Sequence, residues 1–184
     1  MSYRYEIRLS GEGGQGLVLA GKILAEAAAI YDNKNATQSQ SYGPEARGGA
    51  SRSEVIISDE EIDYPKAIHI DLLLALTQES CNKYVKDLKE GGILVIDADA
   101  IKDCPTGRFK TVKVPIIETA RSKIGRVVVA NIVALGIIVE LTKIVSMEAI
   151  EAAILARVPK GTEKLNLEAF KIGTEIGKQY ASET

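Results

Sequence analysis

The chain is poor in the residues that hold metals. Its 184 residues include two cysteines, Cys81 and Cys104, and one histidine, His69. A structural zinc takes four Cys or His ligands and an iron–sulfur cluster usually takes four thiolates, so this chain alone can assemble neither. The two cysteines also lack a general base at recognisable spacing. We therefore predict no metal site and no catalytic residue on this chain.

The chain also lacks a strong net charge, a long apolar run and a recognisable signal peptide. Lysine and arginine number 23 and aspartate and glutamate 25, which gives a formal net charge of −2 and no field to attract nucleic acid. The apolar stretch Val127–Val139 is shorter than the roughly 20 residues that a membrane helix needs. The N-terminus has no basic region followed by an apolar run, and two cysteines make no disulfide framework. We expect a cytoplasmic protein with neither a nucleic-acid partner nor a membrane partner.

The order of predicted elements indicates a single α/β domain over residues 1–184. Hydrophobic residues make up 46% of the chain, an ordinary fraction for a globular protein. Continuous apolar strands require cover on both faces, so we predict a three-layer α/β/α sandwich with a mixed or largely parallel sheet. The predicted strands are Tyr3–Leu9, Glu54–Ser58, Asp71–Leu76, Ile93–Ile96 and Lys110–Val114. The predicted helices are Leu17–Tyr31, Cys81–Lys89 ending at Gly91–Gly92, Asn131–Ile144, one capped by Ser146 that stops before Pro159, and one capped by Asn166 that buries Ala169, Ile172, Ile176 and Tyr180.

A glycine-rich turn, GEGGQG, lies between the first predicted strand and helix, as in a Rossmann-like unit. Glycines allow positive φ and close approach of a ligand, and a following helix offers unpaired N–H groups to an anion. The alternative is a tight turn that binds nothing small. A dinucleotide site needs an acidic residue about 20 residues after the glycines to bind the ribose hydroxyls. The segment at that distance, Ala36–Ser41, contains no acidic residue. Our candidate turn, for a ligand or an interface, is Gly11, Gly13, Gly14, Gln15 and Gly16.

A partial phosphate-loop match overlaps this turn. Gly16, Gly21 and Lys22 fit most of G-x-x-x-x-G-K, but Ile23 stands where a serine or threonine would reach Mg²⁺. The intervening residues are apolar and predicted to be helical. Nucleotide hydrolysis is therefore disfavoured.

The segment Ala36–Ser53 is unusually polar, and its part from Ser41 to Gly49 predicts an irregular loop that presents side chains. An arginine there could clamp a carboxylate or phosphate with two hydrogen bonds. The alternative is a surface pair of Glu45 with Arg47, worth less than about 1 kcal/mol. Our candidate residues for an interface or anion contact are Tyr42, Gly43, Pro44, Glu45, Arg47, Gly48 and Gly49.

Four other polar residues receive structural interpretations. His69, at the edge of an apolar strand, is expected to be structural. Asn131 is predicted to cap the apolar helix that it begins. Asp97 and Asp99 follow a strand, where turn and cap roles are favoured over cation binding.

The motifs together resemble one family. The turn, the loop and the residues around them are similar to the gamma subunit of 2-oxoacid:ferredoxin oxidoreductases. The amino-acid sequence of the loop most resembles the 2-oxoglutarate branch of that family. The resemblance spans nearly the whole chain. It is carried by Gly11–Gly16, Ala20–Gly21, Leu24–Ala28, Gly43–Gly49, the Glu54–Ser58 strand with its acidic turn, and Asn131 before Ala134–Gly136.

The resemblance implies a reaction and a division of labour. A 2-oxoacid, coenzyme A and oxidised ferredoxin would give acyl-CoA, carbon dioxide and reduced ferredoxin. Thiamine diphosphate, Mg²⁺ and [4Fe–4S] clusters would lie on alpha, beta and often delta subunits. This chain would be inactive alone, would complete the assembly and the coenzyme A approach, and would self-associate when isolated.

Two other interpretations stay open at this point. One is a free-standing nucleotide-binding or small-molecule-binding domain that uses the Gly11–Gly16 turn. The other is a structural interaction protein without a ligand. For the subunit interpretation, Arg47→Ala is expected to weaken assembly or to raise the apparent KM for coenzyme A.

Overall fold

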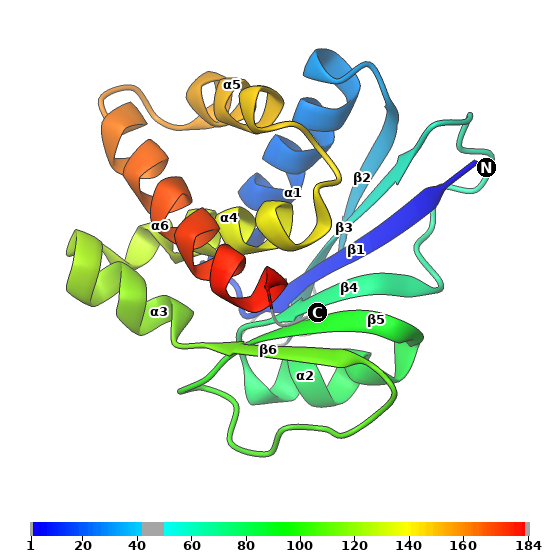
Figure 1. The fold of residues 1–184 in the computed structure, drawn as a ribbon, viewed down its shortest axis with the longest axis horizontal. Coiled ribbons are helices and arrows are strands. Elements are labelled where there is room, and N and C mark those ends of the chain that lie inside the picture. Colours follow the sequence, from blue (N-terminus) through cyan, green and yellow to red (C-terminus); the bar gives the residue numbers. More distant parts are fainter. Residues whose placement is uncertain (1, 42–49, 183–184) are drawn as a thin grey trace.

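A six-stranded mixed sheet forms the centre of the computed structural model, which describes residues 2–41 and 50–182 (Figure 1). The strand order is β2-β3-β1-β4-β5-β6. Strands β1, β4, β5 and β6 run parallel, whereas β3 pairs antiparallel with both β1 and β2. The strands are β1 (Arg4–Gly11), β2 (Asn35–Ser41), β3 (Ser51–Ser58), β4 (Ile70–Ala75), β5 (Leu88–Asp97) and β6 (Lys110–Val114).

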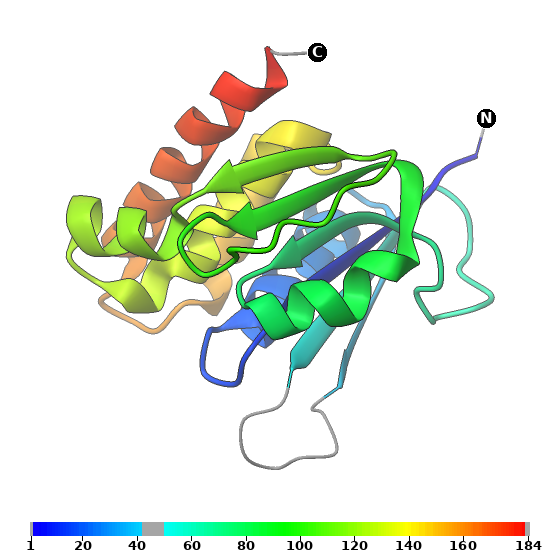
Figure 2. The same cartoon turned by 90° about the horizontal axis from the view of Figure 1, so that it is seen from below.

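The helices cover the two faces of the sheet unequally (Figures 1 and 2). One face carries α1 (Leu17–Glu26), α4 (Ala130–Thr142), α5 (Met147–Arg157) and α6 (Glu163–Ala181). In the described residues, only α2 (Gln78–Tyr84) covers the other face. The predicted three-layer α/β/α arrangement is thus confirmed, with one thin layer. The remaining helical elements are α3 (Ile116–Thr119), the 3₁₀ turns η2 (Val85–Asp87) and η4 (Val127–Val129), and the π-helical turns η1 (Ala27–Tyr31) and η3 (Ala120–Ile124).

The apolar pattern of the strands explains this layering. Leu72 and Leu74 of β4 join the large core under α1 and α4, while Leu73 joins the smaller core beneath α2. Strand β1 is apolar on one face only: Ile7 faces the large core, whereas the charged Arg8 faces the thin layer. No helix of the described part of the chain is both long and apolar enough to cross a membrane.

Strand β2 is the largest difference from the predicted elements. The polar residues Asn35–Ser41, for which no strand was predicted, form an edge strand that pairs with β3. An edge position tolerates such polarity, since one side of the strand faces solvent. The predicted strands therefore lacked β2, because polar edge strands carry no apolar pattern.

The predicted helix Cys81–Lys89 was also wrong in its bounds. The helix begins after Thr77, whose hydroxyl accepts a hydrogen bond from the Ser80 N–H at 3.2 Å. The chain then leaves the helix through η2, and β5 already begins at Leu88. Gly91 has a φ of +78° inside β5, so this glycine shapes an irregular strand and does not end a helix.

Helices α4 and α6 cross at unusually short range. A Cβ on Gly173 would lie 2.1 Å from the Val133 carbonyl oxygen, and one on Gly136 would lie 2.4 Å from that of Phe170. The close approach determines which face of α6 is buried. Ala169 is buried as predicted, but the other residues buried on this face are Phe170, Gly173, Thr174 and Gly177. Ile172, Ile176 and Tyr180 are only partly buried.

The start of α6 also differs from the prediction. The helix begins at Glu163, and Asn166, expected as its cap, lies inside the helix and is buried. Its side-chain amide donates to the Thr162 carbonyl at 2.9 Å and to the Thr162 hydroxyl at 3.0 Å. The predicted Ser146 cap of α5 is confirmed, because its hydroxyl accepts from the Ala149 N–H at 3.2 Å.

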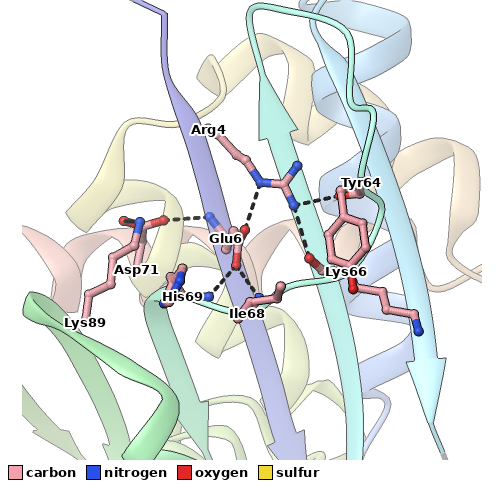
Figure 3. Close-up of polar contacts among 8 residues, drawn as sticks. All are labelled: Arg4, Glu6, Tyr64, Lys66, Ile68, His69, Asp71 and Lys89. Carbon is pink, nitrogen blue, oxygen red and sulfur yellow. Dashed lines mark hydrogen bonds and ion pairs between the residues drawn. The ribbon is translucent and has the colours of Figure 1, made fainter.

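A buried carboxylate ties the irregular segment 59–69 to β1 (Figure 3). Glu6 is 5% exposed, and its Oε2 accepts from the backbone N–H groups of Ile68 and His69 at 2.7 and 2.9 Å. Its Oε1 accepts from Arg4 Nε at 2.8 Å, and the Arg4 Nη2 reaches the Tyr64 carbonyl at 2.7 Å. His69 takes part in these contacts through its backbone N–H, and its side chain is exposed.

Replacing Glu6 with alanine is expected to lower the free energy of unfolding by about 2 kcal/mol, because three donors lose the buried carboxylate that they share as an acceptor. Urea denaturation measures the change. Glu61→Ala is the matched control, since Glu61 is exposed in the same segment and should change stability by less than about 0.5 kcal/mol. Equal effects of the two substitutions would refute the role of Glu6.

Candidate functional site

The glycine turn forms a tight connection from β1 to α1. Gly14 and Gly16 have φ angles of +89° and +73°, a left-handed conformation that favours glycine. The Glu12 N–H donates to the Gln15 side-chain oxygen at 2.9 Å, and that oxygen would lie 2.1 Å from a Cβ on Gly11. By contrast, a Cβ on Gly13 would meet nothing within 4 Å. The turn is therefore closely packed at both ends and open at Gly13–Gly14.

Asn131 fastens the turn to α4. Its Nδ2 donates to the Gly16 carbonyl at 3.0 Å, and its Oδ1 accepts from the Ile132 N–H at 2.9 Å. The side chain belongs to the second residue of α4, whose N-cap position is Val129, so the predicted capping role was wrong. The contact could not be inferred from local sequence, because 115 positions separate the two partners.

The turn lies at a place where open α/β sheets bind ligands. From β1 the chain passes to β2 and β3 on one side of β1 and then to β4 on the other, which makes the carboxyl end of β1 a topological switch point. Three hollows meet at Gly14, with volumes of about 150, 220 and 270 Å³. Apolar residues, among them Val127 and Val128, line the two smaller hollows, whereas the largest one is open to the turn residues 12–18, Ser51 and Arg52.

Arg52 is a candidate site residue that the sequence analysis missed. It lies near the start of β3 and lines the hollow beside the glycine turn, and its side chain is 37% exposed. Its Nε pairs with Glu54 at 3.1 Å, and the same carboxylate pairs at 3.2 Å with the buried Arg8. The Tyr84 ring lies 5.7 Å from the Arg52 guanidinium carbon. The sequence shows a charged residue at every second position in the first half of β3, Arg52 and Glu54, but only the pairing of β3 with β1 places this cation at the turn.

The other sequence-predicted residues lie away from the turn or outside the described part of the chain. The loop candidates Tyr42, Gly43, Pro44, Glu45, Arg47, Gly48 and Gly49 lie outside the described residues. Asp97 has the expected turn role, because its carboxylate accepts from the backbone N–H groups of Asp99, Ala100 and Ile117 at 2.9–3.0 Å. Within the described residues, no group of three or more His, Cys, Asp or Glu side chains could hold a metal ion.

Comparison with known proteins gives consistent results over most of the chain. Residues 6–176 match the family model described as pyruvate ferredoxin/flavodoxin oxidoreductase. The 2-oxoglutarate synthase subunit KorC of Methanocaldococcus jannaschii is 54% identical over 178 residues, which cover 96% of this chain and 95% of the relative.

Two solved structures share the fold. The gamma subunit of a keto/oxoacid ferredoxin oxidoreductase from Geobacter sulfurreducens is 58% identical, with a TM-score of 0.87 over 95% of this chain and 99% of that one. The 2-oxoglutarate:ferredoxin oxidoreductase of Magnetococcus marinus is 24% identical and has a TM-score of 0.84 over 96% of this chain and 31% of the longer one. This second likeness shows the fold alone.

An open α/β sheet with a glycine turn at its switch point defines the structural class, and the matches define the family. The chain belongs to the pyruvate ferredoxin/flavodoxin oxidoreductase family. Within it the chain is a gamma-type subunit of the 2-oxoacid:ferredoxin oxidoreductases, as its motifs predicted.

Proposed function

We propose that this gamma-type subunit, with residues 1–184 forming one domain, serves a 2-oxoglutarate:ferredoxin oxidoreductase. The complex would convert 2-oxoglutarate, coenzyme A and oxidised ferredoxin to succinyl-CoA, carbon dioxide and reduced ferredoxin. The observation that carries the proposal is the near full-length similarity to a subunit named for 2-oxoglutarate. A viologen-coupled assay of the assembled complex tests it, with 2-oxoglutarate expected to be used fastest and pyruvate preference contradicting it.

The chain's own residues fit a role without a resident cofactor. Two cysteines and one histidine are too few for a [4Fe–4S] cluster, and the described residues offer no metal cluster. In the proposed complex, thiamine diphosphate, Mg²⁺ and the clusters would lie on alpha, beta and delta partners, which would supply the decarboxylation and the electron transfer to ferredoxin. This chain's part is to bind and orient a substrate or to complete the assembly.

The glycine turn is suited to the phosphate groups of coenzyme A. The first N–H groups of α1 lack partners within the helix and carry partial positive charge. The open space at Gly13–Gly14 allows an anion to approach the backbone, and Arg52 lies at the same hollow. Its Nε pairs with Glu54, and a guanidinium carries further N–H donors that an anion could use. Arg47, the predicted anion contact, lies outside the described residues, so its role stays a prediction.

Arg52→Ala is expected to raise the KM for coenzyme A about tenfold and to leave kcat nearly unchanged, because one charge-assisted contact in the substrate complex is lost. Steady-state kinetics of the assembled complex measures both constants. The matched control is Arg108→Ala: Arg108 is exposed, pairs with Glu90 and lies toward the amino end of the sheet's parallel strands. An unchanged KM in Arg52→Ala would contradict the assignment of Arg52 and leave the family role intact.

A partner-facing surface is also supported beside the turn. Val127 and Val128 are 44% and 74% exposed, and both border hollows that include Gly14. Exposed apolar residues next to a functional turn are typical of a surface that another subunit covers. We therefore expect this surface to meet the alpha or beta subunit and to cause self-association of the isolated chain.

A free-standing dinucleotide domain is less well supported. Strand β2 is an edge strand antiparallel to β3, and it contains no acidic residue to bind a ribose. In a dinucleotide fold, the second strand would instead lie parallel and next to β1.

A further inference from the structure

The two cysteines of the chain belong to one small apolar cluster on the thin face of the sheet. Cys81 lies on α2, and Cys104 lies in the connection from β5 to β6. Both belong to the small apolar cluster beneath α2, Cys81 as a fully buried member and Cys104 as a partly buried one. The reactive groups therefore share one environment although 23 positions separate them in the sequence.

A side-chain amide holds the two segments together. Gln78, one helical turn before Cys81, donates through Nε2 to the Asp103 carbonyl at 2.9 Å. Its Oε1 accepts from the backbone N–H groups of Lys102 and Asp103 at 2.9 and 3.0 Å. These bonds fix the residue before Cys104 against the same helix face that carries Cys81, since positions three apart lie on one face.

The electrostatics of the thiols agree with this proximity. Burial, and after it the charge of Cys104, raises the pKa of Cys81 to about 11. Cys81 is 0% exposed and protonated at neutral pH, so external reagents neither reach nor readily modify it. Cys104 is the accessible member of the pair, and its Sγ has one polar contact in the described structure, at 3.7 Å from the Pro105 carbonyl.

We propose that Cys104 and Cys81 form a peroxide-responsive thiol pair that closes to an intrachain disulfide between α2 and the β5–β6 connection. The Cys104 thiolate attacks a peroxide oxygen, the O–O bond breaks, and sulfenic acid and water form after protonation. The Cys81 sulfur then attacks the Cys104 sulfur and gives up its proton, and a second water leaves as the S–S bond forms. Two thiols are thereby oxidised by two electrons and one hydrogen peroxide is reduced to two waters.

The pairing has a physical consequence for Cys104. A partly exposed sulfenic acid without a partner thiol proceeds to irreversible sulfinic acid under continued oxidation. A neighbouring thiol held by the fold reacts as an intramolecular partner of high effective concentration, which compensates for its low thiolate fraction. The disulfide would store the oxidation reversibly and fasten the connection to α2.

Mass spectrometry of the full chain after treatment with hydrogen peroxide tests the proposal. Free thiols are alkylated, dimedone traps sulfenic acid, and trypsin releases residues 67–83 with Cys81 and residues 103–108 with Cys104. The expected product is a cross-link between these two peptides within one chain, two mass units lighter than their sum and reversed by dithiothreitol. The cross-linked chain should also melt about 5 °C higher than the reduced chain.

Two variants keep the result interpretable. In Cys81→Ala the cross-link should vanish and dimedone labelling of Cys104 should rise about tenfold, while reduced Cys81→Ala serves as the folding control by its melting transition. In Cys104→Ser, Cys81 should remain unmodified. Equal dimedone labelling of wild type and Cys81→Ala, a cross-link found only between two chains, or an unreactive Cys104 would each overturn the proposal.

Discussion

Replacing Gly173 with alanine is expected to lower the free energy of unfolding by at least about 4 kcal/mol. The new Cβ would lie 2.1 Å from the Val133 carbonyl oxygen and 3.0 Å from the Gly136 Cα, so the backbones of α4 and α6 would have to separate. The helix propensity of alanine returns only about 1 kcal/mol. Thermal unfolding measures the loss as a melting temperature about 10 °C lower.

Two substitutions on the same helix calibrate that result. Gly177→Ala meets mainly the Glu140 side chain, at 2.7 Å to its Cβ, and should cost less than Gly173→Ala. Glu175→Ala, on the exposed side of α6, should change stability by less than about 0.5 kcal/mol. If Gly173→Ala were as stable as wild type, the close α4–α6 crossing would be wrong.

Gly16→Ala is expected to destabilise the chain by about 2–3 kcal/mol. Its φ of +73° strains any L-residue with a side chain, and the added Cβ would lie 2.5 Å from Asn131 Nδ2. Urea denaturation of Gly16→Ala, Asn131→Ala and the double variant separates the two causes. The double variant should lose less than the sum of the single losses, because removing Asn131 relieves the clash. Exact additivity would contradict the contact.

Gly13→Ala is a stability control for Gly16→Ala and also tests whether the turn binds coenzyme A. A Cβ there meets nothing within 4 Å and the φ angle is not left-handed, so Gly13→Ala should leave stability within about 0.5 kcal/mol of wild type. If coenzyme A phosphates approach this open backbone, the same methyl should raise the KM for coenzyme A about tenfold in the assembled complex. Unchanged kinetics would argue that the turn is an interface feature and not a ligand site.

The centre of the sheet was predictable because β4 and the second half of β5 are continuous apolar runs, which are typical of strands covered on both faces. Asp71–Leu76 and Lys110–Val114 were predicted within one residue of β4 and β6. Strand β2 was missed because edge strands carry no apolar period that distinguishes them from loops. The helix predicted over Leu17–Tyr31 has the expected extent, although its last turn, Ala27–Tyr31, is π-helical and leaves Tyr31 45% exposed.

The site was predictable only where local sequence determines it. The glycine turn was recognised because glycine is needed where φ is positive, at Gly14 and Gly16. The contact of Asn131 with Gly16 and the placement of Arg52 beside the turn both depend on tertiary packing. Likewise, α6 buries glycines rather than Ile172 because α4 approaches it too closely for larger side chains.

The central claim is that this chain completes a 2-oxoglutarate-oxidising complex. The most direct measurement is reconstitution of the complex with and without this subunit, followed by viologen reduction with 2-oxoglutarate and coenzyme A. We predict co-purification with thiamine-binding and iron–sulfur chains, activity that requires this subunit, and 2-oxoglutarate as the fastest substrate. Full activity without this chain, or a chain that purifies with no partner, would contradict the account.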